Sequence, residues 1–272
     1  MENLSEIICK LKQEFLKSYD GNSHTTEVLP NAASPTIQIK NEYISLLHEF
    51  LEINPIYSNK ISQKLLETEC TIYEGDLNNY WIDSIKHDAS YAPFYPTWMF
   101  SAFCLAIETK NLGYEQIVDI GSGDGRIAYC GKILGLNSIS IEIDENLVKM
   151  QETLSEKTKV MFNPICSDAT LFDFETIPRK KSIFVIGGVP EIGDILAEAV
   201  IKNVLNIPSF SDSSFVLTGS HSHREFSRDT TNFGWGILMK KLELRIISTI
   251  SLPTYWTMEQ EFETPYLFTK KE

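Results

Sequence analysis

From Glu115 onward, short apolar segments alternate with segments of helical periodicity. This alternation predicts five strands separated by helices, at residues 116–120, 138–143, 160–162, 183–186 and 214–218. Strands that alternate with helices form a parallel sheet with both faces covered. Two further segments, 244–250 and 261–268, look like a closing antiparallel pair. We therefore expect an α/β fold with a Rossmann-like, mostly parallel seven-stranded sheet and helices on both faces.

The first third of the chain carries a helical pattern instead. Apolar residues recur at helical spacing in residues 4–15 and again in 43–51, and a third short helix is expected from Ser58 through Leu66. The segment Tyr91–Trp98 has two prolines and four aromatic residues, and Pro96 suits the first turn of a helix to about Lys110. We predict a smaller helical region, 1–90, that caps the site and selects the substrate, followed by the α/β domain, 91–272.

Composition narrows the range of partners. The net charge is −13, whereas nucleic-acid binders usually carry a basic field, so DNA or RNA is disfavoured. A local basic groove would depend on the late cations around Arg224, Lys240 and Arg245. The sequence contains no run of about 18 apolar residues, so we predict no membrane span. The five cysteines lack metal-ligand spacing and the N-terminus lacks a signal-peptide pattern, so we expect no metal site and a cytoplasmic location.

The loop after the first expected strand reads Asp119-Ile-Gly121-Ser-Gly123-Asp-Gly125. Glycines allow a sharp turn and close backbone approach to a ligand, and the following helix start offers unpaired N–H groups. A dinucleotide fingerprint would need glycine where Arg126 stands. Asp119 and Asp124 would repel a pyrophosphate, but they suit a ligand with an ammonium and a sulfonium. Gly121, Ser122, Gly123 and Gly125 are therefore candidate contacts of such a ligand.

Two further strand ends carry polar residues. Glu142 ends the second strand, where a carboxylate can accept hydrogen bonds from both hydroxyls of a ribose. Ser167-Asp168-Ala169 follows the third strand, where a short polar side chain can meet an adenine amino group. Because the carboxyl ends of parallel strands meet at one edge of the sheet, these motifs are expected around one crevice.

Together, the runs Val118–Gly125, Ile141-Glu-Ile-Asp144 and Ser167-Asp-Ala169 resemble the class I S-adenosylmethionine-dependent methyltransferase family. The resemblance covers roughly residues 90 to 220. It implies that Asp119 and the glycines line the methionine part, that Glu142 with Ile143 lines the ribose, and that Asp168 with Ala169 lines the adenine. The run Tyr91–Thr97 together with Gly-Asp-Gly-Arg126 is similar to archaeal protein-lysine methyltransferases, in which such a segment folds over the cofactor.

The fourth strand departs from the pattern of amino-directed DNA and glutamine methyltransferases, because Ile186-Gly-Gly-Val-Pro-Glu191 replaces their Asn-Pro-Pro-Tyr type motif. Gly187 could let substrate approach the methyl group. Candidate catalytic residues are Glu191, His221 and Tyr95, and none is assigned. Glu191 also fits a first-turn helix acid. The aromatic residues Tyr91, Tyr95, Trp98 and Trp235 could form a substrate wall or pack in the core.

The resulting hypothesis is an S-adenosylmethionine-dependent methyltransferase that acts on an amine-bearing acceptor, either a protein lysine or a small molecule. An aminopropyl or aminocarboxypropyl transferase similar to spermidine or nicotianamine synthases is a rival on the same fold. Against it, the acidic pair of that group is missing from Gly187-Gly-Val-Pro. A non-catalytic S-adenosylmethionine-binding protein is the second rival. The oligomeric state is left open.

Overall fold

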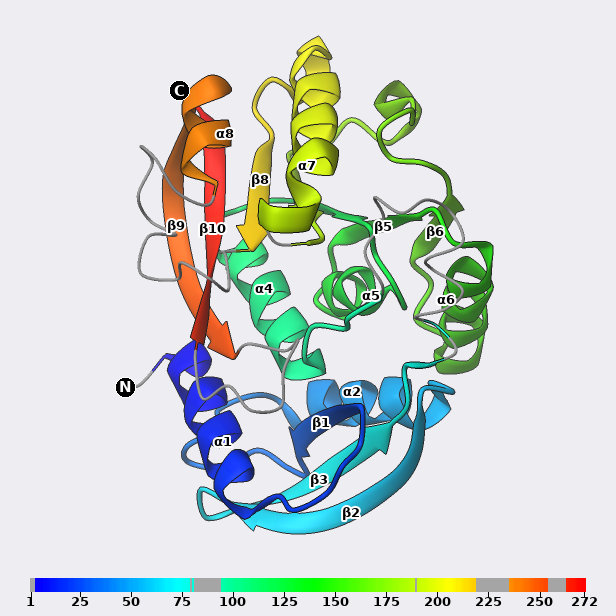
Figure 1. Ribbon diagram of the computed structural model, residues 1–272, viewed down its shortest axis with the longest axis vertical. Coiled ribbons are helices and arrows are strands. Elements are labelled where there is room, and N and C mark those ends of the chain that lie inside the picture. Colours follow the sequence, from blue (N-terminus) through cyan, green and yellow to red (C-terminus); the bar gives the residue numbers. More distant parts are fainter. Residues whose placement is uncertain (1–2, 79, 81–93, 189, 219–234, 254–262) are drawn as a thin grey trace.

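The computed structural model describes residues 3–78, 80, 94–188, 190–218, 235–253 and 263–272. Its larger sheet has seven strands in the order β6-β5-β4-β7-β8-β10-β9 (Figure 1). The strands are β4 (Gln116–Ile120), β5 (Asn137–Glu142), β6 (Asn163–Cys166), β7 (Ser182–Ile186), β8 (Ser214–Thr218), β9 (Leu244–Pro253) and β10 (Glu263–Lys271). The first five pair in parallel, and β10 is antiparallel to both of its neighbours. The expected fold class is confirmed.

Helices cover both faces of this sheet. They are α4 (Met99–Asn111), α5 (Arg126–Ile133), α6 (Glu145–Thr158), α7 (Pro190–Leu205) and α8 (Gly236–Lys241). The helices pack on the sheet through two buried hydrophobic clusters. One cluster contains residues of α4, α5 and α6, and the other contains residues of α7 and α8. In β4 all five residues are buried, which explains its continuous apolar sequence. No helix in the described ranges combines the length and the apolar character that a membrane crossing requires.

The N-terminal region is a mixed unit, so its prediction as purely helical was wrong. Two helices are present as expected, α1 (Leu4–Ser18) and α2 (Asn41–Ile53), but three antiparallel strands accompany them in the order β1-β3-β2. These are β1 (Thr25–Pro30), β2 (Tyr57–Leu65) and β3 (Thr68–Gly75). The expected helix from Ser58 is strand β2. Most of its residues are exposed, so it lacks the apolar alternation by which a half-buried strand is recognised.

Two element boundaries also differ from expectation. Helix α4 begins at Met99, because the carboxylate of Glu27 in β1 accepts the Met99 N–H at 2.7 Å, and Pro96 lies in the irregular segment before it. Strand β6 begins at Asn163, where pairing with Ile139 of β5 starts. The expected strand at 160–162 is therefore only the approach to it. Both shifts depend on partners distant in the sequence.

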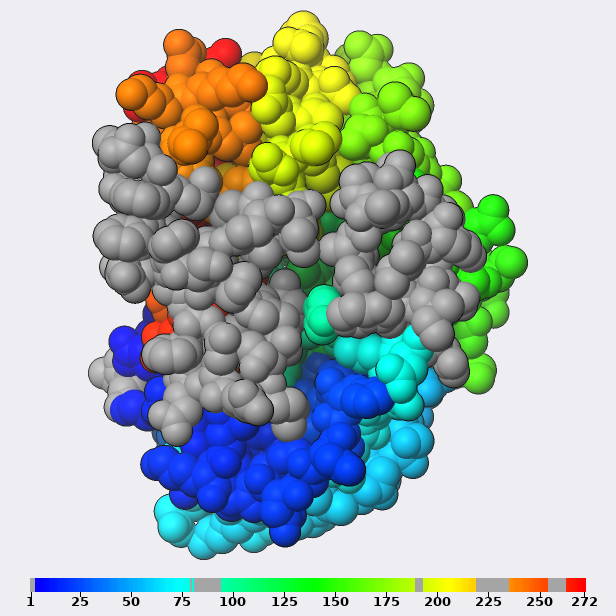
Figure 2. Space-filling model, in the orientation of Figure 1, coloured from blue at the N-terminus to red at the C-terminus, as the bar shows by residue number. Residues whose placement is uncertain are grey.

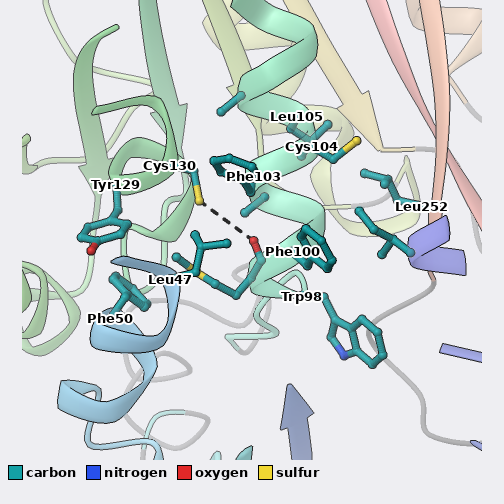
Figure 3. Close-up of a cluster of buried hydrophobic side chains, with 14 of the residues drawn as sticks. Leu47, Phe50, Trp98, Phe100, Phe103, Cys104, Leu105, Tyr129, Cys130 and Leu252 are labelled. Atoms are coloured by element: carbon teal, nitrogen blue, oxygen red, sulfur yellow. Dashed lines mark hydrogen bonds between the residues drawn. The ribbon is translucent and has the colours of Figure 1, made fainter. Parts of the chain in front are cut away.

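The N-terminal region shares its core with the α/β part of the chain (Figure 3). Phe50 of α2 packs on Tyr129 of α5, with ring centroids 4.8 Å apart, and Leu47 lies beside the side chains of α4. The Tyr129 hydroxyl donates to the Leu46 carbonyl at 2.8 Å. In Figures 1 and 2 this region occupies one end of the molecule. The predicted boundary near residue 90 falls outside the described residues and stays a prediction.

Candidate functional site

The glycine loop between β4 and α5 depends on backbone conformations that other residues rarely adopt. Gly121, Gly123 and Gly125 have φ angles of 65°, 57° and 78°. A Cβ atom on Gly123 would lie 2.0 Å from the Phe94 ring, and one on Gly125 would lie 2.9 Å from the Phe162 ring. The loop therefore requires glycine at Gly123 and Gly125 for space as well as for φ.

Glu142 connects the end of β5 to this loop. One of its carboxylate oxygens accepts the Gly123 N–H at 2.8 Å, and the other accepts the N–H groups of Ile143 and Asp144 at 2.8 and 3.1 Å. A carboxylate has about four acceptor positions, so about one stays available to a ligand hydroxyl in this arrangement. Burial raises the pKa of Glu142, and the three N–H donors oppose that rise. The sequence thus correctly grouped Glu142 with Gly123.

Asp119 lies at the base of the loop and is also buried. Its carboxylate accepts the Ala128 N–H at 3.3 Å, in the first turn of α5. Burial raises the pKa of Asp119 well above its ordinary value, the Ala128 N–H lowers it, and the charges of Asp124 and Glu142 raise it further. Asp119 therefore satisfies part of the helix start that was expected to face a ligand.

Asp124 does not offer its charge to the crevice, which corrects the expectation from the loop sequence. Its carboxylate is bound by Arg126, through Nε at 2.9 Å and Nη2 at 2.6 Å, and by the amide of Asn54 at 2.8 Å. The Arg126 guanidinium also donates to the carboxylate of Glu27. In the sequence, Arg126 excludes a dinucleotide fingerprint and contributes to the resemblance of Gly-Asp-Gly-Arg126 to lysine methyltransferases, but nothing local indicates that Glu27, 99 residues away, is its partner.

Gln151 of α6 is a loop contact that sequence reasoning missed. Its amide nitrogen donates to the Ser122 hydroxyl at 3.0 Å and to the Gly123 carbonyl at 2.7 Å. Its amide oxygen accepts from Ser140 of β5 at 2.6 Å. Helix α6 is itself capped by Asp144, which accepts the N–H groups of the first turn. In the sequence, Gln151 is only a polar residue within a predicted helix, and its burial is seen only in the structure.

The third motif follows β6 at the same edge of the sheet. The Ser167 N–H donates to the Glu142 carbonyl at 2.9 Å, so the turn containing Asp168 and Ala169 begins beside the Glu142 strand end. Asp168 accepts both the backbone N–H and the hydroxyl of Thr170. Ala169 is buried, and Ile143 and Asp168 are partly exposed. The structure therefore brings the three predicted motifs together.

Gly187 follows β7 on the other side of β4. Its N–H donates to the Ile120 carbonyl at 2.8 Å. A Cβ atom there would lie 3.0 Å from the carbonyl oxygens of Ile120 and Gly121. The need for glycine at this position therefore comes from packing against the loop, in addition to any approach of substrate.

The aromatic segment before α4 lies against the loop. Phe94 packs on Gly123, whereas Tyr95 is 38% exposed, and burial raises its pKa. Trp98 and Trp235 are 3% and 1% exposed and belong to the core. Phe94 contacts the loop, whereas the folding of this segment over a cofactor and the likeness to lysine methyltransferases stay predictions.

Several predicted positions lie outside what the structure describes. Tyr91 and His221 are outside the described ranges, as is Arg224 of the basic groove, and the side chain of Glu191 is likewise not described. Glu191 itself lies in the first turn of α7. Among the described residues, no group of three or more His, Cys, Asp or Glu side chains could hold a metal ion.

The charges around the loop are predominantly negative. Asp119 and Glu142 are both buried, and Arg126 is bound to Asp124 and Glu27. Neither the Asp119 nor the Glu142 carboxylate forms an ion pair with a residue in the described ranges, and burial without such a partner is costly, which is why their pKa values rise. A cationic ligand in contact with the loop would offset this cost, and an anionic phosphate would add to it.

No protein-family model and no curated protein sequence matches this chain. Solved structures with similar folds include a TehB-like S-adenosylmethionine-dependent methyltransferase from Corynebacterium glutamicum. That likeness has 12% identity and a TM-score of 0.43, and covers 63% of this chain and 88% of that one. Another is the magnesium protoporphyrin IX methyltransferase of Synechocystis with bound S-adenosylmethionine, with 12% identity and a TM-score of 0.46, covering 64% and 78%. At these values the fold assignment rests on the chain's own strand order.

Proposed function

We propose that this protein is an S-adenosylmethionine-dependent methyltransferase with an amine-bearing acceptor. The observation that carries the proposal is the meeting of Glu142 with the glycine loop, in which its carboxylate accepts the Gly123 N–H at 2.8 Å. This contact joins an acid suited to a ribose to a loop suited to close backbone approach. The buried acid Asp119 beneath the loop favours a cationic ligand over a phosphate.

The residue roles follow the resemblance of the sequence motifs. Asp119 and the glycines would contact the methionine part, Glu142 and Ile143 the ribose, and Asp168 with Ala169 the adenine. Glu142 has about one free acceptor position, so binding both ribose hydroxyls requires one of its three backbone hydrogen bonds to lengthen or break. We therefore expect ligand binding to change the backbone around Glu142.

The chemistry needs proximity more than an acid–base pair. The amine nitrogen attacks the methyl carbon in line with the sulfur, the C–N bond forms as the C–S bond breaks, and S-adenosylhomocysteine leaves. The amine must arrive deprotonated or lose its proton before attack. The net charge of −13 favours a basic acceptor, such as a lysine-containing protein or a small amine. The mixed N-terminal region would select this acceptor.

Calorimetry tests the cofactor. The chain should bind S-adenosylmethionine, and Glu142→Gln should bind it at least about tenfold more weakly, since a good hydrogen bond to a charged group is worth about 1.5–3 kcal/mol. Glu145→Gln is the matched control, because Glu145 lies three residues later and is exposed. Absence of binding at millimolar ligand would reject the proposal, and equal loss in both variants would reject the role of Glu142.

Product analysis tests the reaction. The protein is incubated with cell extract and S-adenosylmethionine labelled in its methyl group. The incubation should yield S-adenosylhomocysteine and a labelled acceptor. Methylthioadenosine in its place would show that the aminocarboxypropyl arm is transferred, and formation of methylthioadenosine only from decarboxylated S-adenosylmethionine would show that an aminopropyl arm is transferred. A protein that binds the cofactor but labels nothing would have a purely binding role. Any of these alternative results contradicts the proposal.

A further inference from the structure

A buried network of charged and polar side chains lies between the glycine loop and the N-terminal sheet. At its centre Arg126, the first residue of α5, is 2% exposed. Its guanidinium donates to Asp124 within the loop, to Glu27 of β1 and to the hydroxyl of Tyr57 in β2, the last at 3.0 Å. The Tyr57 hydroxyl in turn donates to Glu27 at 2.9 Å.

The network joins the loop to several distant parts of the chain. Asn54, just after α2, donates to Asp124 at 2.8 Å, and Arg126 donates to the Thr97 carbonyl at 2.5 Å. Glu27 also receives the first N–H of α4, from Met99, at 2.7 Å. The segment that contains Phe94, the N-terminal sheet and the loop therefore meet at one guanidinium.

The planar guanidinium suits this position because its donors point in fixed directions toward several acceptors at once. Burial alone would lower the pKa of Arg126, but Asp124, Tyr57 and Glu27 together raise it well above the ordinary value. The side chain therefore stays charged, and its partners cannot separate without leaving a buried charge unpaired. An arrangement of this kind restricts how the loop can move.

We propose that Arg126 is a positioning residue for the glycine loop, and that Glu27 and Tyr57 of the N-terminal sheet act through it to determine the affinity of the loop for its ligand. This inference rests on the proposed function for the identity of the ligand, S-adenosylmethionine. The N-terminal region then supports the conformation of the cofactor-binding loop in addition to capping the site. None of its residues needs to contact the cofactor for this effect, since Asp124 and Arg126 lie within or next to the loop.

Two tyrosines of the N-terminal sheet provide a matched pair of variants. Tyr57→Phe removes the hydroxyl that joins Arg126 to Glu27, and Tyr73→Phe removes a hydroxyl whose hydrogen bond goes to His48, at 2.7 Å, and not to Arg126 or Glu27. The two rings are neighbours, with centroids 6.3 Å apart, and each variant keeps its ring. Tyr57→Phe loses two hydrogen bonds to charged groups and Tyr73→Phe loses one to His48, so Tyr57→Phe should fall further in melting temperature.

The first readout is hydrogen exchange of a peptide that covers residues 121–128, measured well below the melting temperature of both variants. Tyr57→Phe should accelerate exchange in this peptide, and Tyr73→Phe should leave it as in the wild type. The second readout is the affinity for S-adenosylmethionine. It should fall about two- to thirtyfold in Tyr57→Phe, the range for residues that couple to a site without touching the ligand, and stay within about twofold in Tyr73→Phe.

Equal loop exchange in the two variants would overturn the proposal, and so would a changed exchange rate with unchanged affinity. If the wild-type protein binds no S-adenosylmethionine, the proposed function fails, but the exchange measurement still decides whether the sheet restrains the loop. The two failures are therefore distinguishable. A general loss of stability is told apart from the expected result because it would accelerate exchange in peptides outside residues 121–128 as well.

Discussion

Substitution of Gly123 by alanine would test whether the loop requires glycine for conformation, for space or for both. Gly123 has a φ of 57°, and alanine in the left-handed region costs roughly 1–2 kcal/mol. Its new methyl carbon would lie 2.0 Å from the Phe94 ring, so the ring or the loop must shift. Overpacking of this kind typically costs about 1–3 kcal/mol. We expect Gly123→Ala to lower the free energy of unfolding by about 2–5 kcal/mol.

Gly135→Ala is the matched control. Gly135 also has a positive φ, 87°, but no heavy atom lies within 4 Å of the position that a methyl carbon would take there. It should therefore lose only the conformational part, about 1–2 kcal/mol. At roughly 2–4 °C per kcal/mol for a chain of this size, Gly123→Ala should melt about 2–12 °C below Gly135→Ala in scanning calorimetry.

A double-mutant cycle isolates the clash. Phe94→Ala should relieve it in Gly123→Ala, giving a favourable coupling energy of about 1–3 kcal/mol, and should show no coupling to Gly135→Ala. Affinity for S-adenosylmethionine should fall at least about tenfold in Gly123→Ala, which corresponds to about 1.4 kcal/mol, and stay unchanged in Gly135→Ala. A coupling energy below about 0.5 kcal/mol, or wild-type affinity in Gly123→Ala, would refute the reasoning.

Three further predictions concern charge and access. Because burial raises the pKa of Asp119, the folded state binds its proton more tightly than the unfolded state, so wild-type stability should fall as pH rises from the ordinary value near 3.8 through the raised one. Asp119→Asn should reduce this dependence in urea titrations at several pH values, while weakening binding of S-adenosylmethionine above the raised pKa; an unchanged pH slope would contradict it. Cys166 is the one exposed cysteine of five, and its Sγ lies 3.8 Å from the Ile143 carbonyl. S-adenosylmethionine should slow its alkylation at about pH 9, chosen because burial and then Glu145 raise the thiol pKa, and equal rates by mass spectrometry would argue against the ribose lying beside Ile143. Arg126→Met should lower the free energy of unfolding by about 3–5 kcal/mol, because Glu27 and Asp124 lose a buried partner. Lys202→Met, which breaks an exposed pair with Glu198, should leave stability almost unchanged, and a similar loss in both would refute this.

The larger sheet was predictable because its signals are local. A parallel strand buried on both faces is a short apolar run, as in β4 and β8, and its helices carry their own periodicity. Strand β2 could not be recognised in the same way, because it is mostly exposed and its pairing with β3 decides its conformation. A segment without an apolar face takes the structure that its neighbours impose.

The same division applies to the site. The sequence by itself determined that Asp119, the glycines, Glu142 and Asp168 meet at one edge of the sheet, because each follows a parallel strand and parallel strands end together. Only the tertiary structure decided which charges face the crevice. Asp124 is neutralised by Arg126, and Arg126 is held by Glu27, 99 residues away, in a sheet that the sequence did not predict. The positions of the strands along the chain follow from local pattern, whereas the pairing of buried charges depends on which distant elements pack together.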